Sequence, residues 1–305
     1  PGLPLRRAEL LADFESLSIN FHEDWPLVSG ADGRLEVTAR ESRVELREAT
    51  SFEAKVTNAV VSIPSNGLYI DAKLDAVVPV ARALLFAQET SMELFAPLIG
   101  GGLVGEGSFG IDASLRVPLK DRPGEPGDFK LKFEFNNVAV SLDDPSMRLD
   151  SLNGAVEYRS PHQIVKSDLS ANLFGMPIDM EITSGSNAQE EFMGVALTGQ
   201  INVAHLLALL EVNDRNIATG NMEYSANLSI FVDSARPSEL GFTSDLVGVG
   251  LTLPEEWAKP PSVSRPLDVN IQFLDSYTSV AFRHGKTSGW IHLSNNRISR
   301  GSVGV

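Results

Sequence analysis

The sequence predicts an all-β fold, in which an elongated, twisted and curled antiparallel sheet forms a groove from repeated units, with a few short helices. Three observations favour this fold class. Apolar and polar residues alternate in many short segments, two long stretches of the chain resemble each other, and turn-forming dipeptides separate the alternating segments.

Alternation marks the strands. Successive side chains of a strand point to opposite faces, so a half-buried strand carries apolar residues at every second position. Residues 129–135 read Phe-Lys-Leu-Lys-Phe-Glu-Phe, and the same pattern recurs at 17–21, 70–74, 111–117, 222–230 and 269–273. We therefore expect a long antiparallel sheet with one apolar face and one polar face.

An internal repeat predicts one continuous β-groove segment over residues 1–305. Gly33–Val37 aligns with Gly154–Tyr158, and Gly107–Leu115 aligns with Gly220–Leu228. Repeated units that stack on one another are typical of architectures that grow along one axis. We expect a first unit at about 25–120, a second at about 128–235 and a partial third at about 236–305.

Each complete unit is expected to hold three strands, a short helix and a strand that starts at glycine. The helices are expected at 80–86 and 204–210; both are apolar on more than one side and should pack against the sheet. A further helical turn is expected at 91–95, before Pro97 and the Gly100–Gly102 run. In the third unit, strands are expected around Ile271, Val280, Trp290 and Ile298.

Turn chemistry is expected to separate the strands. The dipeptides that predict turns are Asp32-Gly33, Asn66-Gly67, Pro123-Gly124, Asn153-Gly154 and Asn295-Asn296. Alternation alone leaves open a closed sandwich or barrel, in which two apolar faces bury each other.

Composition excludes several classes of protein. Of the 305 residues, 43% are hydrophobic and 21% charged, which suits a folded chain with a large core. The net charge of −15 disfavours nucleic acid as a partner, because phosphate binding depends on Lys and Arg. No apolar run is long enough for a transmembrane helix, and there is no cysteine for a disulfide or thiolate site. The chain begins without Met or a signal peptide, so we expect an internal fragment of a longer protein.

The sequence carries no pattern that predicts catalysis, so we expect a protein that is not an enzyme and has no cofactor, metal site or catalytic residue. The run Gly105–Gly110 has dinucleotide-type glycine spacing, but a strand follows it where the fingerprint needs a helix. Asp143-Asp144 predicts a turn, and His205 is expected to be solvated or at the edge of the core rather than a ligand. No zinc-type spacing occurs among His22, His162, His205, His284 and His292.

An ordered series of segments resembles the AsmA-like proteins, most closely their YhdP branch. The series runs through Pro118-Leu119, 129–142, Leu149–Val156 and Asp168–Ile178, and Trp25-Pro26-Leu27 and Arg265-Pro266-Leu267 fit the same pattern. The resemblance implies a periplasmic protein of a Gram-negative envelope, anchored in the inner membrane by a segment that this chain lacks. It implies that the chain binds phospholipid acyl chains in an apolar groove and conducts them from the inner to the outer membrane. Outer-membrane or other envelope proteins are possible further partners.

The middle of the chain supplies the candidate groove residues, because its alternating strands place apolar side chains on one face. They are Ile111, Leu115, Phe129, Leu131, Phe133, Phe135, Leu169, Ala171, Leu173, Ile178, Met180 and Ile182. The alternative is a periplasmic β-rich scaffold or interaction module whose apolar core is sealed.

Overall fold

The structure is a computed structural model in which side chains and backbone are described for most of the chain. The described residues are 9–19, 27–89, 103–118, 127–142, 148–160, 163–186, 191–209, 212, 215–231, 236–253, 257–274, 276–294 and 297–304. The helical turn expected at 91–95 and the dipeptides Asp143-Asp144, Pro123-Gly124 and Asn295-Asn296 lie outside these residues.

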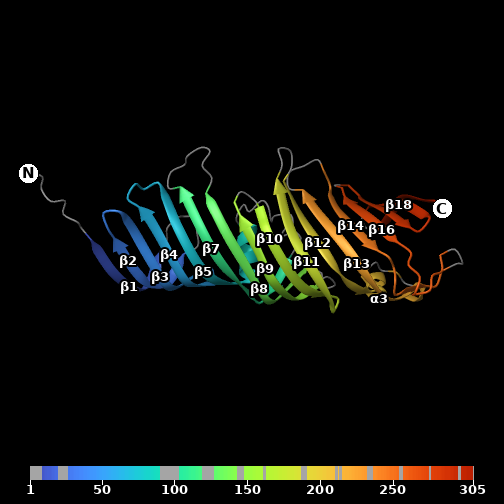
Figure 1. Cartoon of the computed structure of the whole chain (residues 1–305), viewed down its shortest axis with the longest axis horizontal. Helices are drawn as coiled ribbons and strands as arrows, with labels where there is room; N and C mark the ends of the chain where they lie inside the picture. The colour runs from blue at the N-terminus through green and yellow to red at the C-terminus, as the bar shows by residue number, and fades with distance from the viewer. Residues whose placement is uncertain are drawn as a thin grey trace, which may run out of the picture.

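Three sets of elements follow one another along the chain (Figure 1). The N-terminal set is β1 (Leu10–Ile19), β2 (Val28–Val37), β3 (Glu41–Ser51), β4 (Ala54–Pro64), β5 (Tyr69–Pro79), α1 (Val80–Glu89), β6 (Leu103–Glu106) and β7 (Ser108–Pro118). The central set is β8 (Asp128–Leu142), β9 (Arg148–Arg159), β10 (Gln163–Leu173), β11 (Met176–Ser186), β12 (Glu191–Asn202), α3 (Val203–Leu209), the 3-10 helix η1 (Arg215–Ile217) and β13 (Ala218–Phe231). The C-terminal set is β14 (Ser238–Ser244), β15 (Val249–Leu251), β16 (Leu267–Phe273), β17 (Thr278–His284), β18 (Thr287–Ser294) and β19 (Arg297–Gly304).

The described strands form a single antiparallel sheet of nineteen strands that does not close on itself. Nearly every strand pairs with the next one in sequence. The exceptions are β6 and β7, which follow each other across Gly107 and both pair with β8, and β14 and β15, which both pair with β13. The pairing begins at β1 and ends at β19 without closing on itself. The sheet is therefore open, and the fold is neither a sandwich nor a closed barrel.

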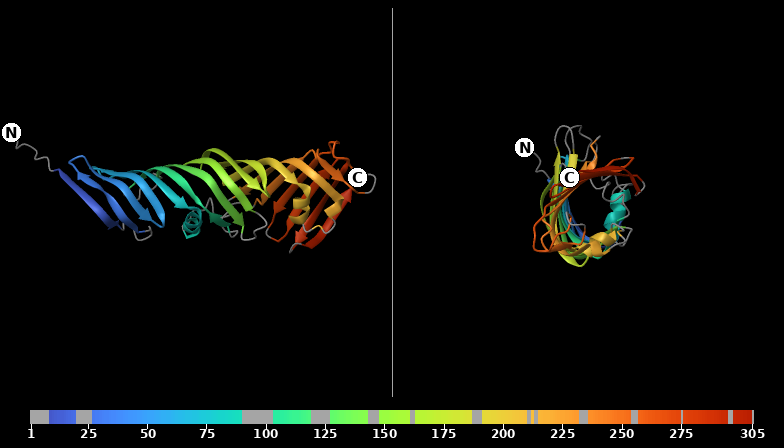
Figure 2. Two further views of the ribbon diagram at one scale, coloured as in Figure 1. Left: turned by 90° about the horizontal axis from the view of Figure 1, so that it is seen from below. Right: turned by 90° about the vertical axis from the view of Figure 1, so that its right-hand side faces the viewer.

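The molecule is long and curls about its length (Figure 2). Its accessible surface is 19239 Å², whereas a compact monomer of 32.9 kDa exposes about 12,500 Å². An excess of this size is expected for an elongated fold, which buries less of its surface than a compact one. The predicted fold class is therefore confirmed: an elongated, curled antiparallel sheet with short helices.

The two predicted helices are present at the expected places. Five strands precede each helix in its set, so the expectation of three strands is wrong; α1 is followed by β6 and β7, and α3 by η1 and β13. Figure 2 shows both helices at the open side of the curl. Val80 and Leu207 join the main buried cluster together with sheet residues such as Phe109. A side chain at Gly105 would lie 2.1 Å from Val80 Cγ1, so this glycine allows α1 to pack directly on the sheet.

Two of the predicted turns are wrong. Asn66-Gly67 does lie between β4 and β5, but Asp32-Gly33 lies inside β2 and Asn153-Gly154 inside β9, where the register shifts at a β-bulge. Asp32 Oδ1 accepts the N–H of Ser16 at 2.7 Å, and Asn153 Oδ1 accepts the N–H of Asn137 at 2.9 Å. A bulge leaves backbone groups unpaired, and short Asp or Asn side chains satisfy them, as they do in turns.

The same bulge occurs at equivalent places in the N-terminal and central sets. Phe14 pairs with Gly33 and Gly33 with Leu46, while Phe135 pairs with Gly154 and Gly154 with Leu169. Two residues after each phenylalanine, Ser16 and Asn137 have φ of 52° and 54°. The local geometry is thus repeated strand by strand, with β1 equivalent to β8.

Candidate functional site

The sheet register assigns apolar side chains to one face over most of its length, because directly paired residues share a face. A single cross-strand row, which we call the first apolar row, runs through consecutive pairings from β5 to β19. Its members are Val78, Phe109, Phe135, Gly154, Leu169, Met180, Leu197, Ala226, Phe242, Val269, Phe282, Gly289 and Val303.

A second apolar row lies next to the first on the same face. Its members are Ala76, Ile111, Phe133 and Val156 in β5–β9, and Ile182, Val195, Leu228, Leu240, Ile271, Val280, Ile291 and Gly301 in β11–β19. Neither row contains an Asp, Glu, Lys or Arg. We call this the inner face, because α1 and α3 pack on it and the sheet curls around it (Figure 2).

The inner face is only partly covered. Phe133, Phe135, Met180 and Leu197 keep part of their surface exposed, and so do Phe242 and Phe282 farther along the rows. Near the ends of the sheet exposure rises to 55% at Leu10 and 58% at Val303. Exposed apolar surface that continues over many strands is unusual for a soluble monomer and marks a binding surface. The inner face can therefore hold an elongated apolar ligand by contact alone.

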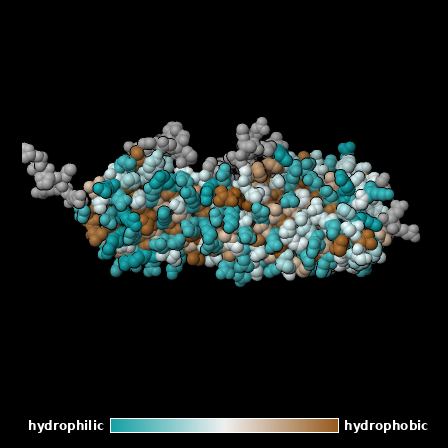
Figure 3. Space-filling view, in the orientation of Figure 1, coloured by the Kyte–Doolittle hydropathy of each residue, from teal (hydrophilic) through white to brown (hydrophobic). Residues whose placement is uncertain are grey.

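The outer face has the opposite chemistry. Figure 3 shows it as mostly hydrophilic, and ion pairs cross between its strands. Arg116 Nε lies 2.6 Å from Asp71 Oδ1, and Arg34 Nε lies 2.8 Å from Asp13 Oδ1. The Arg116 guanidinium hydrogen-bonds the Asp71 carboxylate and so lowers its pKa. These ion pairs keep the outer face hydrated, so the inner face is the surface available for apolar contacts.

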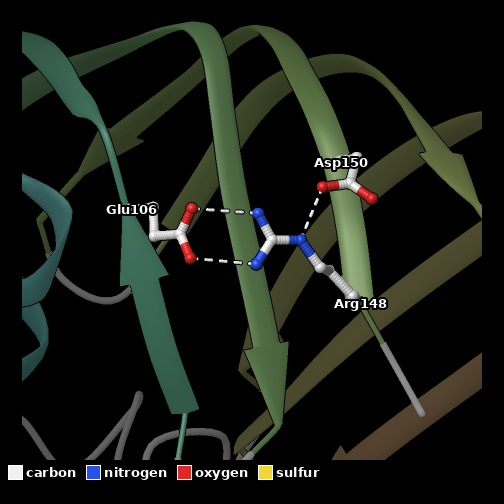
Figure 4. A network of polar contacts seen from close by, with 3 residues as sticks. All are labelled: Glu106, Arg148 and Asp150. Carbon is white, nitrogen blue, oxygen red and sulfur yellow. Dashed lines mark hydrogen bonds and ion pairs between the residues drawn. The ribbon is translucent and has the colours of Figure 1, made fainter. Parts of the chain in front are cut away.

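One outer-face network spans the junction of the N-terminal and central sets (Figure 4). Arg148 in β9 donates Nη1 to Glu106 Oε1 at 3.0 Å, Nη2 to Glu106 Oε2 at 2.9 Å and Nε to Asp150 Oδ1 at 2.6 Å. Glu106 belongs to β6, and β8 lies between β6 and β9, so the Arg148 side chain reaches across β8. The guanidinium lowers the pKa of Glu106, and the bidentate pair links β6 to β9 across β8.

All twelve residues predicted for the groove lie on the inner face. Phe129 pairs with Leu115, Phe133 with Ile111, and Leu169 with Met180. The remaining six follow the same register: Leu131, Phe135, Ala171, Leu173, Ile178 and Ile182. Their neighbours Lys130 and Lys132 pair with Arg159 and Glu157 on the outer face. Contact of the twelve with a lipid stays a prediction.

Three of the twelve are packed rather than open. Leu169, Ala171 and Ile178 are 3%, 5% and 2% exposed and belong to the main buried cluster. The same cluster includes Val203 and Leu207 of α3, so the central set closes over its own inner face at this end of its strands. These three side chains act as core, while the other nine are partly exposed.

Sequence reasoning missed the C-terminal part of the inner face. Phe242, Val269 and Phe282 continue the first apolar row, and Tyr224 stacks on Phe242 with ring centroids 5.4 Å apart. Alternation at 269–273 was the available signal. Closer to the middle of the sheet, the ring centroid of Phe109 lies 5.4 Å from that of Phe135 and 6.1 Å from that of Phe133. These residues form a local group of three phenyl rings.

The described residues offer little other chemistry. They contain no group of three or more His, Asp or Glu side chains that could hold a metal ion. Gly105 lies in β6, and Gly107, with φ of +91°, lies between β6 and β7, so this glycine run is a break between two strands. His205 lies on α3, exposed, with its ring 5.9 Å from that of Phe174. No described helix has the length and apolar character needed to cross a bilayer.

Comparison with known proteins identifies the family. No curated protein and no solved structure matches the chain. The family model described as YhdP protein matches residues 8–305, a range that takes in every described strand from β1 to β19. The match agrees with the ordered series of segments found in the sequence. Since it spans nearly the whole length, the chain belongs to the YhdP protein family.

Proposed function

We propose that this chain binds phospholipid acyl chains on its inner face and lets them slide along it, as part of lipid transport between the inner and outer membranes of a Gram-negative envelope. One observation carries the proposal: two adjacent apolar rows cross most of the sheet without an Asp, Glu, Lys or Arg. Membership of the YhdP family, a family of bacterial envelope proteins, is consistent with lipid transport.

Physical chemistry supports sliding along such a face. An acyl chain of about 16 carbons that enters water exposes apolar surface at a cost of about 12 kcal/mol. A continuous apolar face removes most of that cost at every position, so no single site has to bind tightly. Partial exposure of the inner face leaves room for a guest, while a polar headgroup can stay in water.

The close packing of the inner face in the central set favours a second candidate function. Because Leu169, Ala171 and Ile178 are buried, a sealed scaffold with protein partners is the alternative. The two functions differ in what touches the inner face. A lipid conduit needs lipid contact in all three sets of strands, whereas a sealed scaffold has only protein contacts there.

Site-specific photocrosslinking in cells separates the two. A photoreactive amino acid replaces Leu74, Phe133 or Phe242 on the inner face of the protein in cells, one position in each set of strands. The matched controls are the adjacent outer-face positions Lys73, Glu134 and Thr243. We expect phospholipid adducts by mass spectrometry at the three inner positions and not at the controls. Adducts to protein alone at the inner positions would favour the scaffold and rule out the conduit.

A further inference from the structure

A hollow on the outer face of the C-terminal set has features that the inner face lacks. It has a volume of about 490 Å³, within the range of small-molecule sites. Phe282 and Gly289 of the first apolar row border it, and two outer-face cross-strand rows supply the other eight lining residues: Asn270, Ala281, Trp290 and Ser302, and beside them Asp268, Arg283, Ser288 and Gly304. Ala281 and Ser302 flank Trp290 in its row, so small neighbours leave one large aromatic side chain as a wall.

Trp290 is held in place by residues that do not line the hollow. The His292 ring centroid lies 4.7 Å from that of Trp290, and the Arg300 Cζ lies 5.5 Å from the Trp290 ring. Tyr277 extends the group, with its ring 4.5 Å from His292. A tryptophan fixed by such contacts offers a ready apolar surface and loses little conformational freedom when a ligand binds.

The polar side chains around the hollow are unused within the described part of the chain. Asp268 and Arg283 are direct register partners, yet they form no ion pair within 4.0 Å. The side chains of Asn270, Ser288 and Ser302 likewise take part in no hydrogen bond among the described residues. Unpaired donors and acceptors beside an aromatic wall are free to bind a ligand.

Two other outer-face hollows differ from the C-terminal hollow in the pairing of their polar side chains. In the hollow across β3–β8, Arg116 is paired with Asp71 at 2.6 Å and Arg43 with Glu45 at 2.8 Å. In the hollow across β11–β16, the Gln200 amide donates to Glu223 at 3.3 Å. Neither is lined by an aromatic side chain of the outer face, and each has at least one polar side chain paired within the sheet.

The chemistry of the C-terminal hollow selects a ligand class. An inorganic or lipid phosphate would meet the Asp268 carboxylate, and an acyl chain would leave the polar groups without partners. A pyranose ring has a flat C–H face that suits an aromatic wall, and its hydroxyls both donate and accept hydrogen bonds. We infer that this hollow binds a neutral glycan, with a sugar ring stacked on Trp290 and its hydroxyls on Asp268, Asn270 and Arg283. The chain's net charge of −15 disfavours an acidic glycan.

Binding of defined trisaccharides tests this inference. Cellotriose and tri-N-acetylchitotriose have β-linked rings with equatorial substituents, and each is titrated into the 305-residue chain. The chain has three tryptophans, and the NMR signal of the Trp290 indole N–H is assigned by its loss in Trp290→Phe. We expect saturable binding of at least one trisaccharide that shifts the Trp290 signal and leaves Trp25 and Trp257 unchanged. Trp290→Ala should weaken binding by about tenfold, and Trp290→Phe by much less.

Two further variants keep the test valid if Trp290→Ala does not fold. Asn270→Ala should weaken binding about threefold through the loss of one hydrogen bond, while Arg116→Ala in the β3–β8 hollow should leave it unchanged. Binding of neither trisaccharide would overturn the inference, as would equal binding by the wild type and Asn270→Ala. Saturable binding of an extended peptide at Trp290 without sugar binding would also overturn it.

Discussion

The N-terminal and central sets use the same backbone device and fill it differently. Equivalent positions across four strands read Leu46, Ala59, Leu74 and Ala113 in the N-terminal set, and Leu169, Met180, Leu197 and Ala226 in the central set. In the central set these residues and α3 belong to or pack against one large buried cluster, which also takes in Val80 of α1 and Phe109 of β7. The smaller separate cluster of the N-terminal set has Val28, Ala31 and Ala49 as its buried members.

The repeated bulge gives the two sets the same strand geometry. Side-chain volume then decides how closed the inner face becomes, as at Met180, where the N-terminal set has Ala59. Leu46 remains partly exposed, whereas its equivalent Leu169 is 3% exposed. Because buried apolar area is the main source of stability, the central set should be the more stable part of the sheet. The N-terminal set should offer a more open inner face.

Replacing the bulge glycines should have the largest effect on stability. A Cβ at Gly154 would lie 2.0 Å from Asp168 O, and Gly154 has φ of +119°. A Cβ at Gly33 would lie 2.2 Å from Glu45 O, without the strain of a positive φ. We expect Gly154→Ala to lower the free energy of unfolding by about 4 kcal/mol and Gly33→Ala by about 2 kcal/mol.

Urea unfolding monitored by circular dichroism measures both losses, and hydrogen exchange shows which strands lose protection. Gly304→Ala is the matched control, because nothing lies within 4 Å of a Cβ at that position. A loss at Gly33 equal to or larger than that at Gly154 would contradict the proposed difference between the two sets.

Truncation of the equivalent leucines should have the next largest effect. Leu169→Ala leaves a cavity in the main buried cluster and should cost about 3 kcal/mol. Leu46→Ala removes a side chain that already contacts water and should cost about 1 kcal/mol. The same urea experiment compares them. Similar costs would mean that the two sets are equally packed, against the burial described above.

The face of each strand could be predicted from the sequence because alternation reports it directly. All twelve candidate residues therefore lie on the inner face, and α1 and α3 begin at or within one residue of the expected positions. What covers a residue depends on elements distant in sequence. Alternation could not tell that Leu169 is closed over by the packing of the central set while Phe133 stays partly exposed.

Other features depend on register across several strands. Asp32-Gly33 and Asn153-Gly154 have the composition of turns, and only the pairing with β1 and β8 makes them bulges. Trp290 gains its hollow from Ala281 on one neighbouring strand and Ser302 on the other. A single sequence read in order gives no sign of that juxtaposition.

The contact between each helix and an earlier hairpin also differs between the sets, and its loss should have the smallest effect. In the N-terminal set, Arg82 of α1 pairs with Glu53 and lies over the Phe52 ring, with Cζ 5.9 Å from the centroid. In the central set, the equivalent contact is between the His205 and Phe174 rings. The ion pair is exposed, so about 1 M salt should screen it.

The pH dependence of the ion pair follows from the pKa of Glu53. The Arg82 guanidinium hydrogen-bonds this carboxylate and lowers its pKa below the ordinary value of 4.5. A lowered folded-state pKa gives stability that is present above the ordinary value and is lost as the pH falls through the lowered one. We therefore expect Glu53→Gln to lower the thermal midpoint slightly at pH 7 and low salt, and to have no effect below the folded-state pKa or in about 1 M salt.

The control is Phe174→Ala in the central set, whose effect should not depend on salt because no ion pair is involved. Calorimetric melts of both variants at low and high salt make the comparison. If Glu53→Gln changes the midpoint equally at both salt concentrations, Glu53 acts through packing. The two helices would then be held by the same kind of contact, and the difference between the sets would lie in the volume of the inner-face side chains alone.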